Sequence, residues 1–196
     1  MQIKTQAQLK HLYIYIILVF ITGCAPTITE LAESDPEFVV AHKDKLLSGD
    51  NVSEETVTAI IDAHNFLGVA AIGVGDYETG ETFFNYVLTL NKTNKQSKYG
   101  LAMIAGHRLF KKGSKTALWD ALEQYGKASY HNPESGEPNY WMGRTYEKKD
   151  DGDHELIIEA YENALQGILP SKLITDTEAR LAAAREKQQT FQDFWK

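Results

Sequence analysis

The chain has 196 residues and a single cysteine, Cys24, so it cannot form an internal disulfide bond. Several short enzyme motifs are missing as well. No two of the histidines after Cys24 are three or four residues apart, which excludes a helical zinc-binding pair. No glycine-rich phosphate loop follows a strand, and no Gly-x-Ser-x-Gly motif occurs. We therefore expect a protein that is not an enzyme and that needs no metal or other cofactor.

Basic residues are in the minority. The chain has 20 Lys and Arg against 27 Asp and Glu, for a formal net charge of −7. The residues before Cys24 carry two lysines and no acid, so the remainder is more acidic still. Because phosphate backbones are bound by basic surfaces, we do not expect nucleic acid as a partner.

Patterns typical of β-strands are also absent. No stretch alternates apolar and polar residues, and the β-branched residues recur at helical spacings. At this length the chain is large enough for one domain with a sizeable core. The predicted fold class is all-α.

A pattern of two paired helices runs from Asp62 to Leu90. Small and apolar residues recur there at helical spacing in two groups, separated by a turn signal at Gly75-Asp76. The first group is Leu67, Gly68 and Ala71, and the second is Gly80, Phe84 and Val87. Because Gly68 and Gly80 are small, the two backbones can approach, and Phe84 can fill the space that they leave.

The same pattern returns twice. The second copy consists of Leu101-Ala102, Ala105, Ala121, Tyr125, Ala128 and Pro133, and the third of Met142-Gly143, Tyr146, Ile157, Tyr161, Ala164 and Pro170. The two halves of the second copy are further apart than those of the first. We expect the additional residues to form an insertion at Lys111–Lys115.

These copies resemble the tetratricopeptide repeat (TPR), a helix–turn–helix unit of about 34 residues. The resemblance implies a TPR-like α-solenoid of antiparallel helix pairs within a domain at 34–196. Its three degenerate repeats are expected at about 61–94, 95–134 and 136–170, with a capping helix at about 175–195. His64, Ala71 and Lys92 depart from the family pattern.

Helix boundaries follow from capping residues. Asp35 and Pro36 predict the start of one short helix over Phe38–Leu47. Ser53 opens the next helix, on whose apolar stripe His64 is expected to be a hydrogen-bonded core residue. The capping helix is predicted to begin at Thr175, with Glu178 completing a capping box. Its apolar stripe is Thr177, Leu181, Ala184, Gln188, Phe191 and Trp195.

The resemblance also implies a concave groove, lined by the first helix of each repeat, that binds a protein or peptide. The expected groove residues are Asn65 and Val69, then Tyr99, Met103 and His107, then Tyr140, Arg144 and Glu147. Tyrosine, methionine and arginine are good anchors for peptides. The alternative is that Tyr99 and Tyr140 pack between repeats or against a terminal helix, and Trp141 is expected in the core.

The amino terminus has the pattern of a signal peptide. Lys4 and Lys10 precede Leu12–Ile21, an apolar run that is too short to span a bilayer as a helix but suits a signal-peptide core. Residues 21–24, Ile-Thr-Gly-Cys, resemble a bacterial lipobox. The alternatives are an ordinary signal peptide and an uncleaved anchor.

The lipobox resemblance implies removal of residues 1–23 and covalent lipid on Cys24, followed by a tether at 24–33. A triacylated cysteine would anchor the chain stably to a membrane. Ala25, rather than Asp, follows the cysteine, which resembles the sorting signal for the bacterial outer membrane, on its periplasmic side.

Together these resemblances imply a lipid-anchored adaptor or scaffold that binds an envelope protein or peptide, similar to lipoproteins of pilus and secretin assembly. Two alternatives remain open: a transporter-associated, solute-handling lipoprotein and a scaffold for peptidoglycan enzymes. An open groove would favour a protein partner, and an enclosed apolar cavity would favour a solute.

Overall fold

The computed structural model describes residues 26–49, 51–150 and 152–195. The predicted signal peptide and lipidated Cys24 lie outside these residues. Within them every named element is a helix, and the only β-type pairing is an isolated bridge between Ser135 and Ile168. The prediction of an all-α fold is therefore confirmed for the described part of the chain.

Three short helices begin the fold: α2 (Ile28–Ser34), α3 (Pro36–Ala41) and α4 (Lys43–Leu46). The prediction of a tether at 24–33 is wrong from Ile28 onward, because Thr27 and Glu30 form a reciprocal capping box that starts α2. Asp35 caps α3 as expected. The single helix predicted over Phe38–Leu47 is instead two helices that meet at His42.

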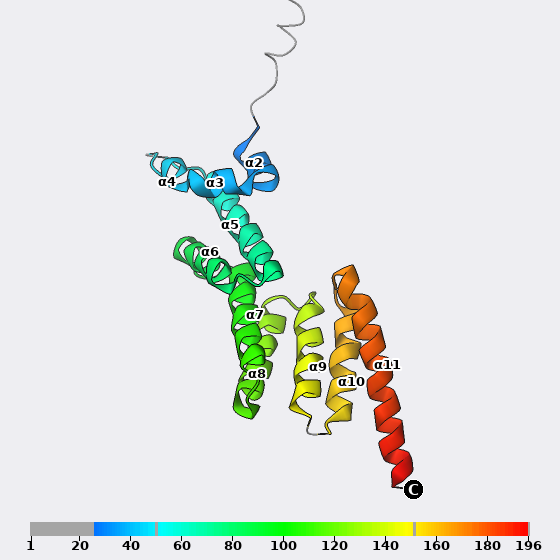
Figure 1. Cartoon of the computed structure of the whole chain (residues 1–196). Helices are drawn as coiled ribbons and strands as arrows, with labels where there is room; N and C mark the ends of the chain where they lie inside the picture. Colours follow the sequence, from blue (N-terminus) through cyan, green and yellow to red (C-terminus); the bar gives the residue numbers. More distant parts are fainter. Residues whose placement is uncertain (1–25, 50, 151, 196) are drawn as a thin grey trace, which may run out of the picture.

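Six longer helices follow as adjacent packed pairs (Figure 1). They are α5 (Glu54–Val74) with α6 (Tyr77–Leu90), α7 (Lys95–Lys112) with α8 (Lys115–His131), and α9 (Glu137–Lys149) with α10 (His154–Gln166). Each pair also contacts the next pair along the chain, α6 with α7 and α8 with α9. A last helix, α11 (Ser171–Phe194), packs against α10.

The turns between paired helices depend on left-handed residues. Gly75 ends α5 at φ 79°, and Gly113 ends α7 at φ 71°, a region that favours glycine. The predicted insertion at Lys111–Lys115 is wrong, because α7 continues through Lys112 and α8 begins at Lys115. The additional residues belong to the end of α7 and the start of α8, and the turn consists of Gly113 and Ser114.

Each pair buries one aromatic ring of its second helix against a glycine of its first. A Cβ placed on Gly68 would lie 2.6 Å from the ring of Phe84, and one on Gly143 would lie 2.5 Å from the ring of Tyr161. Tyr125 has the same relation to Gly106 in the second pair. All three rings are completely buried. The predicted role of Gly68 and Phe84 is therefore confirmed.

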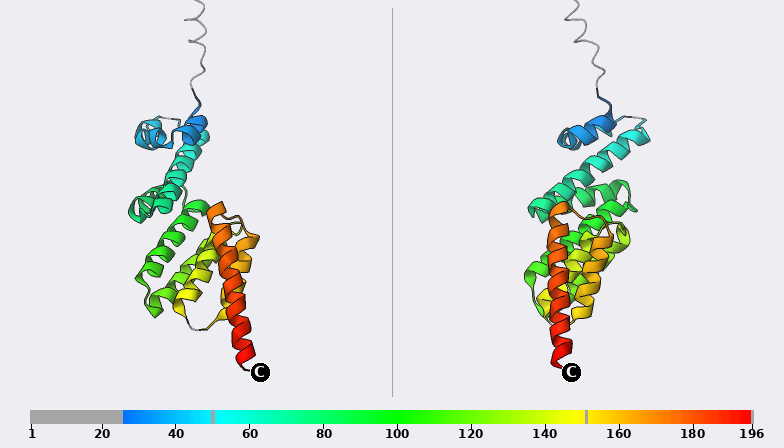
Figure 2. Two further views of the ribbon diagram at one scale, coloured as in Figure 1. Left: turned by 45° about the vertical axis from the view of Figure 1, so that its right-hand side comes forward. Right: turned by 90° about the vertical axis from the view of Figure 1, so that its right-hand side faces the viewer.

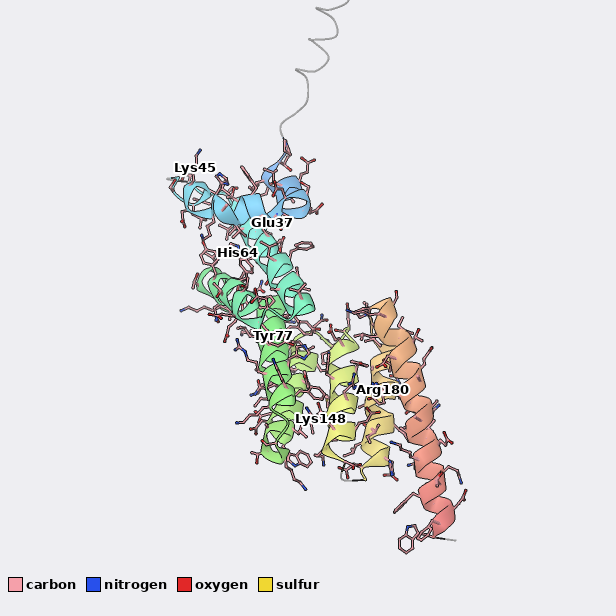
Figure 3. All side chains as sticks on the ribbon, in the orientation of Figure 1. Glu37, Lys45, His64, Tyr77, Lys148 and Arg180 are labelled. Carbon is pink, nitrogen blue, oxygen red and sulfur yellow. The ribbon has the colours of Figure 1, made fainter. Side chains whose placement is uncertain are left out.

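Helix α5 is long and apolar enough to cross a membrane by length and composition alone. It packs, however, against α2, α3, α6 and α7. Its first half contributes Ala59, Ile60 and Ala63 to a core cluster that α2 and α3 cover. His64 is buried between α5 and α6, and its Nδ1 lies 2.7 Å from the carbonyl oxygen of Ile60, as expected of a core histidine (Figure 3).

Helix α11 begins earlier than predicted. Pro170 precedes its first residue, Ser171, and Thr175 lies inside the helix, so the predicted capping box is wrong. With 24 residues, α11 is longer than the 13-residue α10 and runs past it at the carboxyl end (Figures 1 and 2). Thr177, Leu181 and Ala184 are buried as predicted, whereas Phe191 and Trp195 are exposed.

Candidate functional site

Most of the predicted groove residues are not accessible. Five of the eight are at most 8% exposed: Asn65, Tyr99, Met103, His107 and Tyr140. Arg144 and Glu147 retain 28% of their side-chain exposure, and Val69 is 44% exposed. The prediction of one open groove lined by all eight residues is therefore wrong.

The predicted groove residues of the second pair are inaccessible because their large side chains pack against the neighbouring pair. Met103 and Tyr99 belong to a core cluster against which Trp141 of α9 packs. The hydroxyl group of Tyr99 lies 3.1 Å from that of Ser135, before α9. Trp141 itself is half-buried and contacts two core clusters, so its predicted place in the core is confirmed.

His107 lies among aromatic rings. Its ring centroid is 4.7 Å from that of Trp141 and 5.6 Å from that of Tyr77, at the start of α6 (Figure 3). Its Nδ1 is 3.0 Å from the hydroxyl oxygen of Tyr125. Burial lowers the pKa of His107 to about 4, so the imidazole is neutral near pH 7. These contacts give His107 a structural role.

Asn65 joins the first and second pairs. Its Oδ1 accepts a hydrogen bond of 2.7 Å from the hydroxyl group of Ser97, which is fully buried in α7. The Nδ2 atom of Asn65 is 3.4 Å from Oδ1 of Asn94, the N-cap of α7. Because buried polar groups need partners, this pairing fixes the contact between α5 and α7.

The third set of predicted residues meets α11. The hydroxyl group of Tyr140 donates to Oδ2 of Asp176 at 2.7 Å and accepts from Nη1 of Arg144 at 2.8 Å. Arg180 contacts Asp176 through Nε and Glu147 through Nη1, each at 2.7 Å. We call these five residues the α9–α11 cluster. The alternative that Tyr140 packs against a terminal helix is thus confirmed.

The charges of the α9–α11 cluster balance, with two arginines and two carboxylates. Hydrogen bonding to Arg180 lowers the pKa of Asp176, and burial raises the pKa of Tyr140. Figure 3 places Arg180 on α11 beside α10. Since α11 supplies Asp176 and Arg180, it fills the space that the predicted groove would have used.

Hollows remain along α11, and two of them that share lining residues are together called the α11 hollow. One has a volume of about 450 Å³ beside the α9–α11 cluster, and the other of about 640 Å³ lies nearer the carboxyl end. Both include His154, Ala183 and Lys187 in their lining. On its exposed side, α11 thus carries charged side chains next to small alanines.

Two groups of exposed apolar residues were predicted only in part: Val69 was expected in the groove, and Phe191 and Trp195 were expected on the apolar stripe of the capping helix. The α5 stripe comprises Phe66, Val69, Ala70, Gly73 and Val74, and the α11 tip comprises Phe191, Phe194 and Trp195. Phe66 and Val74 are 59% and 82% exposed. The sequence signal for the α5 stripe was its helical spacing: Phe66 directly precedes Leu67 of the core stripe and therefore lies on a different face of the helix.

The described residues contain no group of three or more His, Cys, Asp or Glu side chains that could hold a metal ion. The candidate site consists of three surfaces: the α5 stripe, the α11 hollow and the α11 tip. No protein-family model matches this chain, and no curated protein is significantly similar to it.

Proposed function

We propose that this chain is a non-enzymatic adaptor of the bacterial envelope. It is built as a TPR-like array and held on the periplasmic side of the outer membrane by lipid on Cys24. The repeated packing of an aromatic ring against a glycine in three successive helix pairs supports the array. The lipobox pattern at residues 21–24 supports the anchor. The partner is a segment of another envelope protein.

One observation supports a binding role above the others: the α5 stripe. Its residues lie at i, i+3, i+4, i+7 and i+8 on the second half of the helix, beyond the part that α2 and α3 cover. The first helices of the other two pairs are better covered on the corresponding face, where Met103 and Ile104 of α7 are 1% exposed and Thr145 of α9 is 0% exposed. Ala70 and Gly73 lie between larger residues, and the space at Gly73 is open. Small residues in this position let a second helix backbone approach closely.

The negative charge of Asp62, next to the α5 stripe, indicates what kind of partner would bind there. Asp62 lies one helical turn before Phe66 on the same face and forms no salt bridge with any described residue. Partial burial and the carboxylate of Glu33 raise the pKa of Asp62. A cation would relieve both effects. We therefore propose an amphipathic helix, with an apolar face and a Lys or Arg at one end, as the segment that binds the α5 stripe.

The shape of the hollows supports a protein partner over a small apolar solute. The described residues line hollows that open to solvent, and the smaller one is edged by Glu147, Arg180 and Lys187. Sites for apolar solutes are usually enclosed and mainly apolar. The resemblance to pilus and secretin lipoproteins makes a secretin the first partner to test, and a peptidoglycan enzyme the second.

Photo-crosslinking in cells that produce the full chain tests the binding surface. A photoreactive residue at Ala70 should capture an envelope protein, and one at Tyr130, which is 82% exposed on α8, should not. Val69→Asp should then reduce capture at least tenfold, whereas Tyr130→Asp should leave it unchanged. Equal capture from both positions would contradict the proposal.

The anchor is tested separately. Cys24→Ser should abolish incorporation of a fatty-acid probe and release the protein from the membrane fraction, because two or more acyl chains are needed for stable anchoring. Equal labelling of the wild type and the variant would show that the lipid, if any, is elsewhere.

A further inference from the structure

The carboxyl end of α11 leaves the rest of the domain. Its buried residues, Thr177, Leu181 and Ala184, all precede the last three turns. Gln188 is half-buried, and every described residue from Gln189 to Trp195 is exposed. Figure 2 shows the same projecting end from two further sides. The ring of Phe191 lies 6.1 Å from that of His154 at the start of α10, and the residues after Phe191 extend further. Because an exposed helix end gains little stability, this projection calls for a physical reason.

The α11 tip is strongly apolar. Phe194 and Trp195 are 79% and 71% exposed, and Phe191 is 56% exposed. The ring of Trp195 lies 6.1 Å from that of Phe191 and 5.4 Å from that of Phe194, measured between centroids. At 150–250 Å² per aromatic side chain, the three together expose roughly 400 Å² of apolar surface. That is as large as the largest patch on a typical monomer, and such patches are often functional.

The surface that could receive these rings lies on the same helix. The part of the α11 hollow with a volume of about 640 Å³ is lined by Ala183, which is exposed and small, together with Phe191 and Phe194. Ala183 and Phe194 are eleven residues apart, which is about three helical turns or 16 Å. One face of α11 therefore carries both a large apolar projection and a shallow hollow of small residues.

We propose that a second copy of this chain covers the α11 tip. Two α11 helices pack antiparallel about a two-fold axis at the level between Lys187 and Thr190, which lie on the same face as Ala183 and Phe194. Phe194 of each copy then faces Ala183 of the partner subunit. Such an interface is isologous, since the same surface is used by both copies.

Area and charge both fit this occupant. Each copy would bury roughly 400 Å² from its α11 tip. Phe191 and Phe194 also line the α11 hollow, so the hollow adds only the smaller area around Ala183, and the interface lies at the low end of the roughly 1,200–2,000 Å² in total that a specific complex buries. The segment from Arg185 to Trp195 carries two basic and two acidic residues, so it is locally neutral in a chain of net charge −7. Like-charge repulsion between two copies is therefore small at this part of the surface.

Disulfide crosslinking of the full chain in intact cells tests the dimer, because the periplasm is oxidising. Thr190→Cys lies near the proposed axis, on the face of α11 that carries Ala183 and Phe194, and should give a disulfide-linked dimer on a non-reducing gel. The matched control is Tyr130→Cys, which is also open to solvent, on α8. The wild type, whose only cysteine is Cys24, shows the background.

Adding Phe194→Asp to Thr190→Cys should lower the dimer band at least tenfold, while a melting curve of the purified variant stays unchanged because Phe194 is exposed. Adding Tyr130→Asp instead should leave the band as it was. A Thr190→Cys band no stronger than that of Tyr130→Cys would overturn the proposal. So would a mixed disulfide with a protein of another mass, or a band that persists with Phe194→Asp. None of these results depends on the partner of the α5 stripe.

Discussion

The first helices of the first and third pairs, α5 and α9, have the same position in their pairs and different surroundings. The face of α9 that carries Tyr140, Arg144 and Glu147 is covered by α11, which brings Asp176 and Arg180 to it. The second half of α5 has no such cover and keeps Phe66 and Val74 exposed. The difference indicates that a helix face in this fold is open only where no later helix supplies matching side chains.

The largest expected effect separates two residues that were predicted to share a groove. Met103 is 1% exposed in the core, so Met103→Ala should lower the free energy of unfolding by about 2–5 kcal/mol. Val69→Ala on the α5 stripe should change it by less than about 1 kcal/mol, because the side chain is already in contact with water. Urea denaturation measures both. Similar losses would mean that α5 is covered as α7 is.

The pH dependence of the free energy of unfolding should reflect the burial of His107 in the second helix pair. The pKa of His107 is about 4 in the fold and about 6.5 in an unfolded chain, so the unfolded state binds more protons between these values. Stability is therefore complete above pH 6.5 and falls as the pH drops toward and below 4, by about 3 kcal/mol in all. Burial also lowers the pKa of His64, which adds to this loss. His107→Gln should flatten the curve more than His42→Gln at an exposed position; equal slopes would contradict the assignment.

Two glycines of α5 offer a finer comparison. Gly68→Ala places a methyl group 2.6 Å from the ring of Phe84, so it should cost about 1–3 kcal/mol through overpacking. Gly73→Ala meets nothing within 4 Å and should stabilise the helix by about 0.5–1 kcal/mol. Thermal melting gives the sign of each change. A destabilising Gly73→Ala would show that the α5 stripe is already occupied.

The smallest effect concerns the ion pairs that close α9. Arg180→Ala removes contacts to Glu147 and Asp176 from a side chain that is 30% exposed, so it should cost about 1 kcal/mol. Arg185→Ala removes a pair with Glu162 in which the arginine is 57% exposed, and should cost less than about 0.5 kcal/mol. Chemical denaturation of both variants compares them. Equal costs would mean that the cluster does not hold α11 in place.

Local patterns in the sequence were sufficient for the helix pairs and for part of the core. Turn signals such as Gly75-Asp76, and the spacing of Gly68 and Phe84, act over short stretches of chain, so they could be interpreted without the fold. The capping box of Thr27 and Glu30 is equally local, but it stands in a segment that was interpreted as a tether. That error came from giving composition more weight than capping.

Which helix faces stay open could not be predicted in the same way. Leu181 and Phe191 lie on one stripe of α11, yet the first is buried and the second exposed because α10 begins at His154, beside Phe191, and covers α11 no further. Tyr140 and Val69 had equivalent places in the proposed groove, and only the position of α11 separates them. Such outcomes depend on contacts between residues that are far apart in the chain.

The position of the first residue of α2 limits how far the helical domain could lie from a membrane that holds Cys24. Ile28 is only four residues after Cys24, and an extended chain spans at most about 3.6 Å per residue. If acyl chains were attached to that sulfur, the segment between Cys24 and Ile28 would span no more than about 15 Å, and α2, α3 and α4 would lie close to the lipid headgroups. The carboxyl terminus lies at the opposite end of the molecule (Figure 1). A paired α11 would then join two such proteins at their far ends, away from the bilayer that holds them.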